Sequence, residues 1–338
     1  MRELIERLKT KEITDEELLF LLETDIAEAL YAEARLIAQN VFGFGVFVRG
    51  LIEFSNFCSQ NCYYCGIRKE NKAAKRYRLS KSEILDACAV GAELGIKTFV
   101  LQSGEDAFYK ADVLADIIRE IRRAYPDSAI TLSVGERTKK DYEIFREAGA
   151  DRYLLRHEAI NPELFKKLHP DSQKLTPRLN CLKNLKDAGF QVGTGFMTGA
   201  PYQTKEHIIQ DIRFLVDFKP EMIGIGTYLT GKNTPFANMQ NGDIETALRV
   251  IAILRIMAPK TNIPATTALA TIHERGRELA ILAGANVVMP NISPMEHRSD
   301  YMLYDNKICL DEKTALDNLK KRLDSIGYKL DFARGDYL

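Results

Sequence analysis

The sequence predicts an α/β protein built as a closed (βα)8 barrel of the TIM type, because strand-like and helix-like segments alternate along most of the chain. The short β-rich runs lie at 45–57, 97–105, 129–136, 151–159, 191–200, 222–230, 263–272 and 286–294. Helical patterns such as KSEILDACAVGAELG fall between them. Eight such units over about 250 residues match the size of this barrel. An open doubly wound sheet shows the same alternation and stays an alternative.

The boundaries between elements support one domain. Several strand-like runs begin just after a glycine, at Gly95, Gly149, Gly189 and Gly284, as expected where a helix ends and the chain enters a strand. No linker rich in proline, glycine or serine divides the chain. We therefore expect a helical N-terminal extension at 1–44, a barrel at 45–310 and a helical C-terminal tail at 311–338.

The N-terminal extension has its own helix signal. Thr14 and Glu17 form a capping-box pattern ahead of a leucine-rich run. The chain begins MRELIERLK, which is charged and has no apolar signal core, and nowhere do 18 uninterrupted apolar residues occur. These features predict a cytoplasmic protein without a transmembrane helix.

Composition excludes some classes of partner. The chain has 338 residues, of which 46% are hydrophobic, and its 47 basic residues equal its 47 acidic residues in number. No global field therefore draws the protein to nucleic acid or to an anionic membrane. The six cysteines, three of them clustered, do not resemble the disulfide framework of a secreted domain.

The cysteine cluster is the strongest chemical signal. The segment CSQNCYYCG places Cys58, Cys62 and Cys65 directly after the first strand-like run. A structural zinc site or an ordinary cubane cluster uses four protein ligands. The other cysteines stand alone, and Cys88 falls in a helical pattern that suits a small core residue. One metal position is therefore left for a ligand that is not protein. A zinc or iron–sulfur scaffold remains the non-enzymatic alternative.

Polar residues also gather at the ends of the predicted strands, where the active sites of such barrels lie. These residues are Gln102, Ser103, Glu105, Ser133, Glu136, Arg156, His157, Glu158, Thr194, Met197, Tyr228, Thr266, Thr267, Met289 and Asn291. We expect them to surround the mouth of one cavity. His157 alternates with Arg156 along its strand, so it should face the other side and pack in the core.

The spacing Cys58-x3-Cys62-x2-Cys65, with Tyr64 before the last cysteine, resembles the signature of the radical S-adenosylmethionine (SAM) superfamily. The resemblance implies that the three cysteines hold one 4Fe–4S cluster and that SAM completes it through its amino and carboxylate groups. It also implies a SAM-cleaving enzyme that produces a 5′-deoxyadenosyl radical and needs a reducing electron donor.

Several further stretches resemble the HydE family of FeFe-hydrogenase maturases. They include KTFVLQSGED, EAGADRYLLRHE, RLNCL, NIPATTA and ANVVMPN. The resemblance implies a sulfur-bearing, cysteine-derived and iron-bound substrate, and partner maturases of the HydG and HydF types. Biotin synthase and methylornithine synthase share the signature and the barrel, so an enzyme of amino-acid or cofactor biosynthesis stays an alternative.

The same resemblance assigns residues to SAM. Ser103, Gly104 and Glu105 correspond to a turn beside the amino group of SAM, where a small residue permits close approach. Glu158 corresponds to a ribose-binding glutamate and Arg178 to an arginine that pairs with the SAM carboxylate. The remaining assigned residues are Tyr64, Ser133 and Met197. Two alternatives stay open, in which Glu105 caps the next helix and Arg178 is a solvated helix residue.

The residues that resemble the HydE substrate site are Gln102, Thr131, Arg156, Thr266, Thr267, Met289 and Tyr304. Thr266 and Thr267 are also good strand residues, and Met289 could fill the core. A buried Arg156 would need an anion, because an unpaired interior charge is costly.

The chain departs from many HydE sequences near its C-terminus. Cys309 matches the first position of a second, Cys-x7-Cys-x2-Cys cluster motif, but Asp317 and Lys320 occupy the other two. We therefore expect no second cluster. A basic run at 69–81 follows the cysteine loop and suits either an acidic electron donor or, more simply, a solvated loop.

Overall fold

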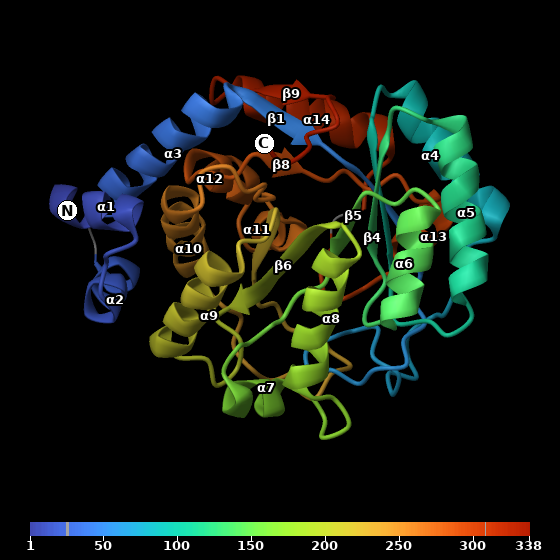
Figure 1. The fold of residues 1–338 in the computed structure, drawn as a ribbon, viewed down its shortest axis with the longest axis horizontal. Coiled ribbons are helices and arrows are strands. Elements are labelled where there is room, and N and C mark those ends of the chain that lie inside the picture. The colour runs from blue at the N-terminus through green and yellow to red at the C-terminus, as the bar shows by residue number, and fades with distance from the viewer. Residues whose placement is uncertain (25–26, 308) are drawn as a thin grey trace.

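The computed structural model describes residues 1–24, 27–307 and 309–338 (Figure 1). Its central element is a parallel sheet whose six strands neighbour one another in chain order. These strands are β2 (Gly50–Ser55), β3 (Thr98–Ser103), β4 (Ala129–Ser133), β5 (Arg152–Leu154), β6 (Gln191–Thr198) and β7 (Met222–Thr227). Each strand begins near the same end of the molecule, so all six carboxyl ends meet at the other end.

The sheet closes into a barrel through single bridges. Met222 of β7 bridges Asn262, Pro264 bridges Val287 of β8 (Val287–Val288), and Asn291 bridges Leu51 of β2, all in parallel orientation. The segments at 262–264 and 287–291 therefore take the places of the seventh and eighth strands. The closed barrel is confirmed, and the open doubly wound sheet is excluded.

Two of the predicted strands were wrong in detail. The run at 263–272 forms no named strand, because after the bridge at Pro264 the chain enters the short helix α11 (Thr267–Ile272). Its alternating alanines are good helix formers, which outweighed the β-branched threonines. The run at 45–57 divides at Arg49 into β1 (Gly45–Val48) and β2, since β1 leaves the barrel to pair with β8 and β9 (Lys329–Asp331).

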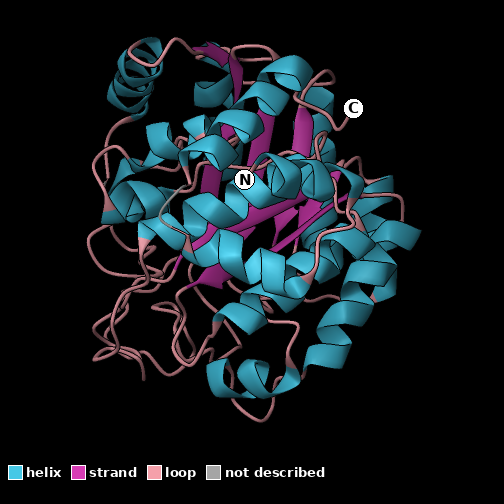
Figure 2. Cartoon of the chain, turned by 90° about the vertical axis from the view of Figure 1, so that its left-hand side faces the viewer, coloured by secondary structure: helices cyan, strands magenta, loops and turns pink. Residues whose placement is uncertain are grey.

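Helices cover the outside of the barrel (Figure 2). They are α4 (Lys81–Glu93), α5 (Ala111–Ala124), α6 (Lys139–Glu147), α7 (Pro162–Leu168), α8 (Leu175–Asp187), α9 (Lys205–Phe218), α10 (Ile244–Met257), α12 (Gly276–Leu282) and α13 (Met295–Arg298). In α5, Leu114, Ile117, Ile118 and Ile121 recur at helical spacing and are buried against the sheet. The glycines at 95, 149, 189 and 284 have positive φ, as expected where a helix gives way to the next strand.

The N-terminal helices form a second layer over one side of the barrel. They are α1 (Arg2–Thr10), α2 (Asp15–Glu23) and α3 (Glu28–Phe42), and they pack on α10. Every residue of α10 from Thr246 to Met257 is buried, because this helix is enclosed between the barrel and the N-terminal layer. The capping box of Thr14 and Glu17 is present, while residues 25 and 26 of the expected extension lie outside the described residues.

The C-terminal segment is only partly the helix that we expected. It contains α14 (Glu312–Asp324), but β9 follows and pairs in parallel with β1. Residues beyond β9 reach the end of the barrel where the strands begin, since Arg152 at the start of β5 donates to the carbonyl of Arg334 and to Asp336. A buried arginine needs such acceptors, and this requirement is not visible in the tail sequence itself.

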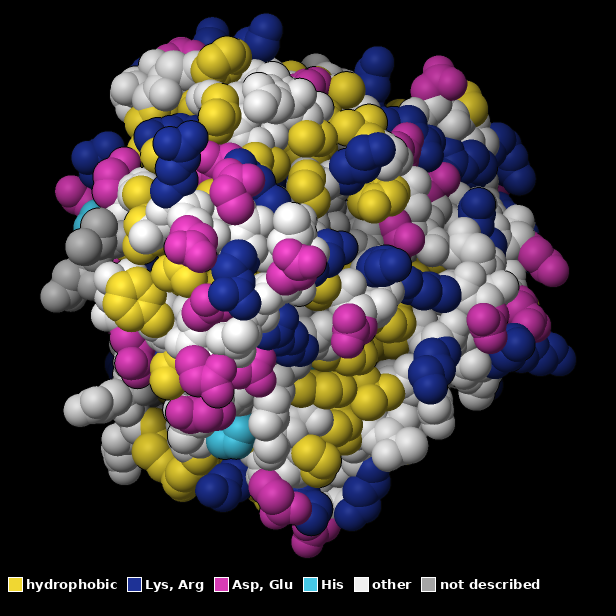
Figure 3. Space-filling model, turned by 60° about the vertical axis from the view of Figure 1, so that its left-hand side comes forward, with side chains coloured by type: hydrophobic (Ala, Val, Ile, Leu, Met, Phe, Trp, Pro, Cys, Tyr) yellow, Lys and Arg dark blue, Asp and Glu magenta, His cyan; other side chains and the backbone are white. Residues whose placement is uncertain are grey.

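The distribution of charge on the surface and the length of the helices agree with what the sequence predicted. On the face shown in Figure 3, basic and acidic side chains are interspersed over the N-terminal helices. Within the described part of the chain, no helix is long and apolar enough to cross a membrane.

Candidate active site

A cavity of about 350 Å³ opens at the carboxyl ends of the strands. It is lined by the three clustered cysteines and by every other residue assigned to SAM or to the substrate except Thr131. Of the strand-end residues expected around its mouth, Glu136, Thr194, Tyr228 and Asn291 do not line it, and neither does His157. Glu136 and Asn291 instead bond to the lining residues Arg178 and Glu53. Thr131 lies on β4 two residues before Ser133, so it shares the inward face but sits deeper. It is buried and its hydroxyl has no partner among the described residues. The structure therefore does not place Thr131 in the cavity wall.

Three backbone hydrogen bonds to other segments of the chain hold the cysteine loop in place. Ser59 N donates to the carbonyl of Glu105 at 2.9 Å, Tyr63 N to that of Leu168 at 3.0 Å, and Gly66 N to that of Leu303 at 2.8 Å. Gly104 makes the first of these approaches possible. A Cβ at this position would lie 2.3 Å from the carbonyl oxygen of Phe57, so any larger residue would displace the loop.

The three thiols face the cavity in a largely apolar setting. Burial raises the pKa of Cys58 and Cys65, and it raises the pKa of Cys62 to about 11. Metal binding must therefore supply the energy that removes these protons. Among the described residues, no three His, Cys, Asp or Glu side chains are placed to hold a single metal ion. In a cubane cluster each cysteine binds a different iron, so the loop suits a cluster better than a single zinc ion.

Glu105 is fixed beside the loop. Its carboxylate accepts from Gln60 Nε2 at 2.6 Å and from Glu136 N at 3.0 Å, and burial raises its pKa. Gly135 allows this placement, because it has a φ of +76° and a Cβ there would lie 1.9 Å from Cγ of Glu105. The alternative in which Glu105 caps the next helix is wrong, since the N-cap of α5 is Lys110.

Arg178 is buried on the first turns of α8. Its Nε donates to Oε1 of Glu136 at 2.8 Å and its Nη1 to the carbonyl of Arg156 at 3.2 Å. Among the described residues no partner is found for Nη2, which leaves one edge of the guanidinium available toward the cavity. The alternative of a solvated helix arginine is wrong.

Glu158 has a strained backbone, with a φ of +65°, and its N–H donates to the carbonyl of Gly195 at 3.1 Å. A non-glycine residue in this region costs about 1–3 kcal/mol and is found at functional sites. Its Oε2 lies 3.0 Å from Nη2 of Arg156, which is half-buried. Glu158 is therefore the anion that Arg156 was expected to need, although the sequence did not predict this pairing.

The polar residues deeper in the cavity come from separate segments. Thr266 is the N-cap of α11 but makes no capping bond, and its buried hydroxyl has no partner among the described residues. The interpretation of Thr266 and Thr267 as strand residues is therefore wrong. Gln102 at the end of β3 donates to the hydroxyl of Tyr301 at 3.3 Å. Met289 and Tyr304 complete this side of the wall.

Sequence reasoning missed an ion pair in the same wall. Lys307 Nζ contacts both carboxylate oxygens of Glu53, at 2.5 and 2.6 Å, and Asn291 Nδ2 donates to Oε2 at 2.7 Å. Glu53 is 2% exposed. A glutamate inside the otherwise apolar run GLIEFS was the available signal, because a buried carboxylate must find a partner.

Two further polar contacts support the loop from outside the predicted set. The side-chain amide of Gln173, in the connection between α7 and α8, lies 3.5 Å from Sγ of Cys62. The hydroxyl of Tyr64 lies 3.1 Å from Nε2 of the buried His169. By contrast, His157 is buried against Asp211 at 3.1 Å, which confirms that it packs in the core. Cys88 is buried in the core as predicted.

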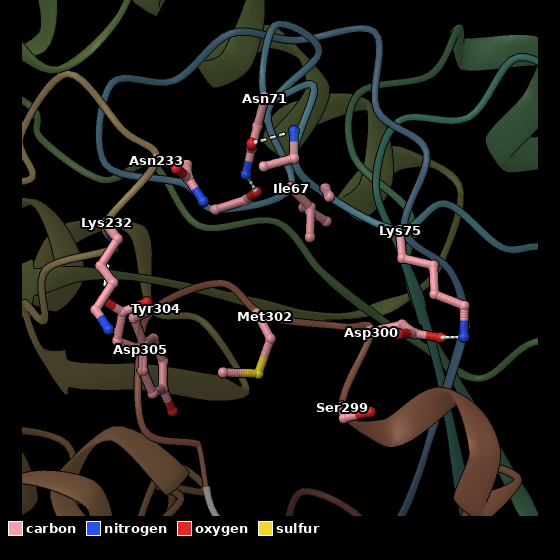
Figure 4. A pocket seen from close by; sticks show the side chains of 14 residues that line it. Ile67, Asn71, Lys75, Lys232, Asn233, Ser299, Asp300, Met302, Tyr304 and Asp305 are labelled. Carbon is pink, nitrogen blue, oxygen red and sulfur yellow. Dashed lines mark hydrogen bonds and ion pairs between the residues drawn. The ribbon is translucent and has the colours of Figure 1, made fainter.

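A smaller pocket of about 270 Å³, shown in Figure 4, shares the lining residues Ile67 and Tyr304 with the cavity. Asn71 donates to the carbonyl of Gly66 at 2.6 Å, and Lys75 pairs with Asp300 at 3.1 Å. The Lys75 contact shows that at least one cation of the basic run is held by an internal partner.

Two comparisons with known proteins, one with family models and one with individual sequences, give results that agree with each other. Residues 52–215 match the family model described as the radical SAM superfamily. The chain is 44% identical over 333 residues to the [FeFe] hydrogenase maturase subunit HydE of Thermotoga maritima, covering 97% of this chain and 95% of that protein.

The second relative is a 3-methylornithine synthase from Methanosarcina barkeri, with 30% identity over 94% of this chain and 90% of that protein. Among solved structures, methylornithine synthase PylB superposes with a TM-score of 0.85 and 27% identity, covering 97% of each chain. The fold of nearly the whole chain therefore recurs in this solved structure.

Proposed function

Because this chain belongs to the radical SAM superfamily and is a homologue of HydE, we propose that it is a maturase of FeFe-hydrogenase. Its reaction would be the attack of a 5′-deoxyadenosyl radical on a sulfur-bearing, cysteine-derived and iron-bound substrate. The observation that carries the proposal is the loop of three cysteines that opens onto the cavity at the carboxyl ends of the strands.

The residues at the mouth of the cavity fit the cofactors that the superfamily implies. Cys58, Cys62 and Cys65 would hold one 4Fe–4S cluster, and the cavity beside them would take SAM. When both are bound and one electron is supplied, they furnish the 5′-deoxyadenosyl radical. The protein itself would then bind and orient the substrate and exclude competing reactions.

Two ion pairs prepare this region for a charged ligand. Glu136 holds Arg178 so that its free Nη2 can pair with a carboxylate, and the carboxylate of Glu105, which lines the cavity, would accept from an amino group. Arg156 holds the strained Glu158, whose carboxylate would accept from the ribose hydroxyls. The proposed supporting contacts come from Tyr64, Ser133 and Met197.

The substrate would lie deeper, between Arg156 and the polar wall. Arg156 Nε has no partner among the described residues, so the guanidinium retains a donor for a substrate carboxylate. The free hydroxyl of Thr266, together with Thr267 and Gln102, supplies neutral hydrogen bonds suited to polar iron ligands. Met289 and Tyr304 would pack against the remainder, and Thr131 would act only from beneath this floor.

The partners and the cofactor count are also part of this proposal. Maturases of the HydG and HydF types would supply and receive the iron-bound material, and a reducing donor would deliver the electron. A single cluster is expected, because Asp317 and Lys320 stand where a second cluster would require cysteines.

A second candidate, methylornithine synthesis, is favoured by the TM-score of 0.85 to PylB. One experiment separates the two. The cluster-loaded protein is incubated with SAM, reductant and either an iron–cysteine complex, lysine or dethiobiotin, and the products are identified by mass spectrometry. The maturase proposal predicts reaction only with the iron–cysteine complex. Conversion of lysine to methylornithine with no reaction of that complex would overturn it.

A further inference from the structure

A second pocket lies behind the wall of the active-site cavity. It has a volume of about 210 Å³ and is enclosed by α11, α12 and α14, which Figure 1 labels. Leu51, Thr267, Met289 and Lys307 line both this side pocket and the cavity, so a single layer of side chains separates the two. Glu274 and Asn318 at its rim are exposed, so the pocket also faces solvent.

The side pocket contains a cation without a partner. Arg277 of α12 lines it and is only partly exposed, yet within the described part of the chain no hydrogen bond or ion pair joins its guanidinium. Burial lowers the pKa of Arg277. The two other cations in the lining are engaged, since Lys307 pairs with Glu53 at 2.5 Å and Arg322 pairs with Glu278 at 2.9 Å. Arg277 is thus available for a carboxylate.

An acceptor without a partner stands beside it. Glu278 is 4% exposed, and its Oε1 accepts from Arg322, while its Oε2 has no hydrogen-bond partner among the described residues. A buried carboxylate oxygen in this state is costly, and an ammonium group would satisfy it. A free guanidinium and a free carboxylate oxygen on neighbouring residues therefore complement a zwitterion.

The rest of the pocket limits the ligand's size and side chain. Leu51, Met289 and Leu319 form an apolar floor. Its volume of about 210 Å³ is smaller than that of the active-site cavity, about 350 Å³, which favours a compact ligand.

We propose that the side pocket is a second ligand site, which binds a compact α-amino acid with its carboxylate on Arg277, its ammonium on Glu278 and its apolar side chain on Leu51 and Leu319. The site is separate from the proposed substrate position at Arg156 and does not depend on the reaction assigned to the cavity.

Binding to the full-length, cluster-loaded protein tests the proposal by calorimetry with three probes of matched length. L-2-aminobutyrate carries both charges, butyrate only the carboxylate and propylamine only the ammonium. We expect aminobutyrate to bind at least about tenfold more tightly than either single-charge probe. Equal binding of butyrate would overturn the zwitterion assignment.

Matched variants locate the site. Arg277→Gln should weaken aminobutyrate binding by at least about tenfold, and Glu278→Gln should weaken it as well. Arg275→Gln removes an exposed arginine next to the same helix and should leave affinity unchanged. Ala315→Phe, which fills the pocket from α14 without altering charge, should also abolish binding, and thermal melting verifies that each variant is folded. Binding that survives Arg277→Gln but is lost in Arg156→Gln would place the amino acid in the main cavity and overturn the proposal.

Discussion

The side-chain amide of Gln173 lies 3.5 Å from Sγ of Cys62. Gln173 is buried in the connection between α7 and α8, so this contact is shielded from water. A cysteine that ligates a cluster is a thiolate, to which the amide can only donate. Hydrogen bonds to the ligating sulfurs help set the potential of iron–sulfur clusters, because they stabilise the more negative, reduced state.

The first prediction concerns this donor. Gln173→Leu should leave the iron content unchanged and lower the reduction potential of the cluster. If the hydrogen bond is worth about 1.4 kcal/mol more to the reduced state, the shift is about 60 mV. The measurement is a redox titration followed by electron paramagnetic resonance. Gln39→Leu, whose amide contacts Tyr328 far from the loop, serves as the control and should not shift the potential. An unchanged potential in Gln173→Leu would remove the proposed role.

The second prediction concerns the cluster ligands. Cys62→Ala should abolish both the 4Fe–4S cluster and reductive SAM cleavage, because the loop offers no replacement thiol. Cys309→Ala should retain four irons per chain and full cleavage, since we expect no second cluster. Iron and sulfide analysis after anaerobic reconstitution, with quantification of 5′-deoxyadenosine, gives both readouts. Full occupancy in Cys62→Ala, or loss of iron in Cys309→Ala, would contradict the assignment.

The third prediction concerns the cation proposed to bind the SAM carboxylate. Arg178→Gln should leave the cluster intact and weaken SAM binding, because loss of a charged partner from a buried site costs about 2–5 kcal/mol, or at least about tenfold in affinity. Glu158→Gln should act in the same direction at the ribose. Lys183→Gln, an exposed cation on the same helix, is the control. Equilibrium dialysis with labelled SAM distinguishes the outcomes, and unchanged affinity in both site variants would exclude these roles.

The sequence predicted most of the cavity because its lining depends on local pattern. Strand-like runs separated by helices place their last residues on one rim, so Gln102, Ser133 and Glu158 could be expected there without knowledge of the packing. How deep a side chain lies in the barrel is harder to predict from the sequence. Thr131 shares the inward face with Ser133, and only the structure shows that it lies below the cavity.

Contacts made by irregular segments could not be predicted in this way. Lys307 reaches Glu53 across 254 positions of the chain, and it does so from a segment without regular periodicity. Gln173 meets Cys62 from a connection between two helices. In both cases the partner is selected by how loops cross the rim of the barrel, which no short-range pattern encodes.

The fourth prediction concerns the C-terminal residues that cover the other end of the barrel. Arg152 is fully buried and its Nη2 lies 2.6 Å from Oδ1 of Asp336. Asp336→Asn weakens this acceptor and should lower the free energy of unfolding by about 1–3 kcal/mol. Chemical denaturation measures the change. Asp317→Asn, at an exposed position of α14, should have no comparable effect, and equal stability of the two variants would refute the structural role of the tail.

The last prediction concerns pH. Nδ1 of His169 lies 2.9 Å from the carbonyl oxygen of Phe165, which can only accept, so Nδ1 carries the proton. Nε2 of the neutral ring must then accept from the hydroxyl of Tyr64. Burial, assisted by the charge of Arg178, lowers the pKa of His169 from 6.5 to about 3. Between these two values the unfolded chain binds more protons at this residue than the folded chain.

The free energy of unfolding should therefore fall as the pH is lowered through this window, with a contribution from His169 of up to about 1.4 kcal/mol per pH unit. His169→Gln removes the titrating group, so its stability should depend less steeply on pH between 6.5 and about 4. The exposed variant His273→Gln should behave as the parent protein. Because acid releases iron from clusters, urea denaturation is performed on the metal-free chain. Parallel stability curves for His169→Gln and the parent would show that folding does not lower the pKa of His169.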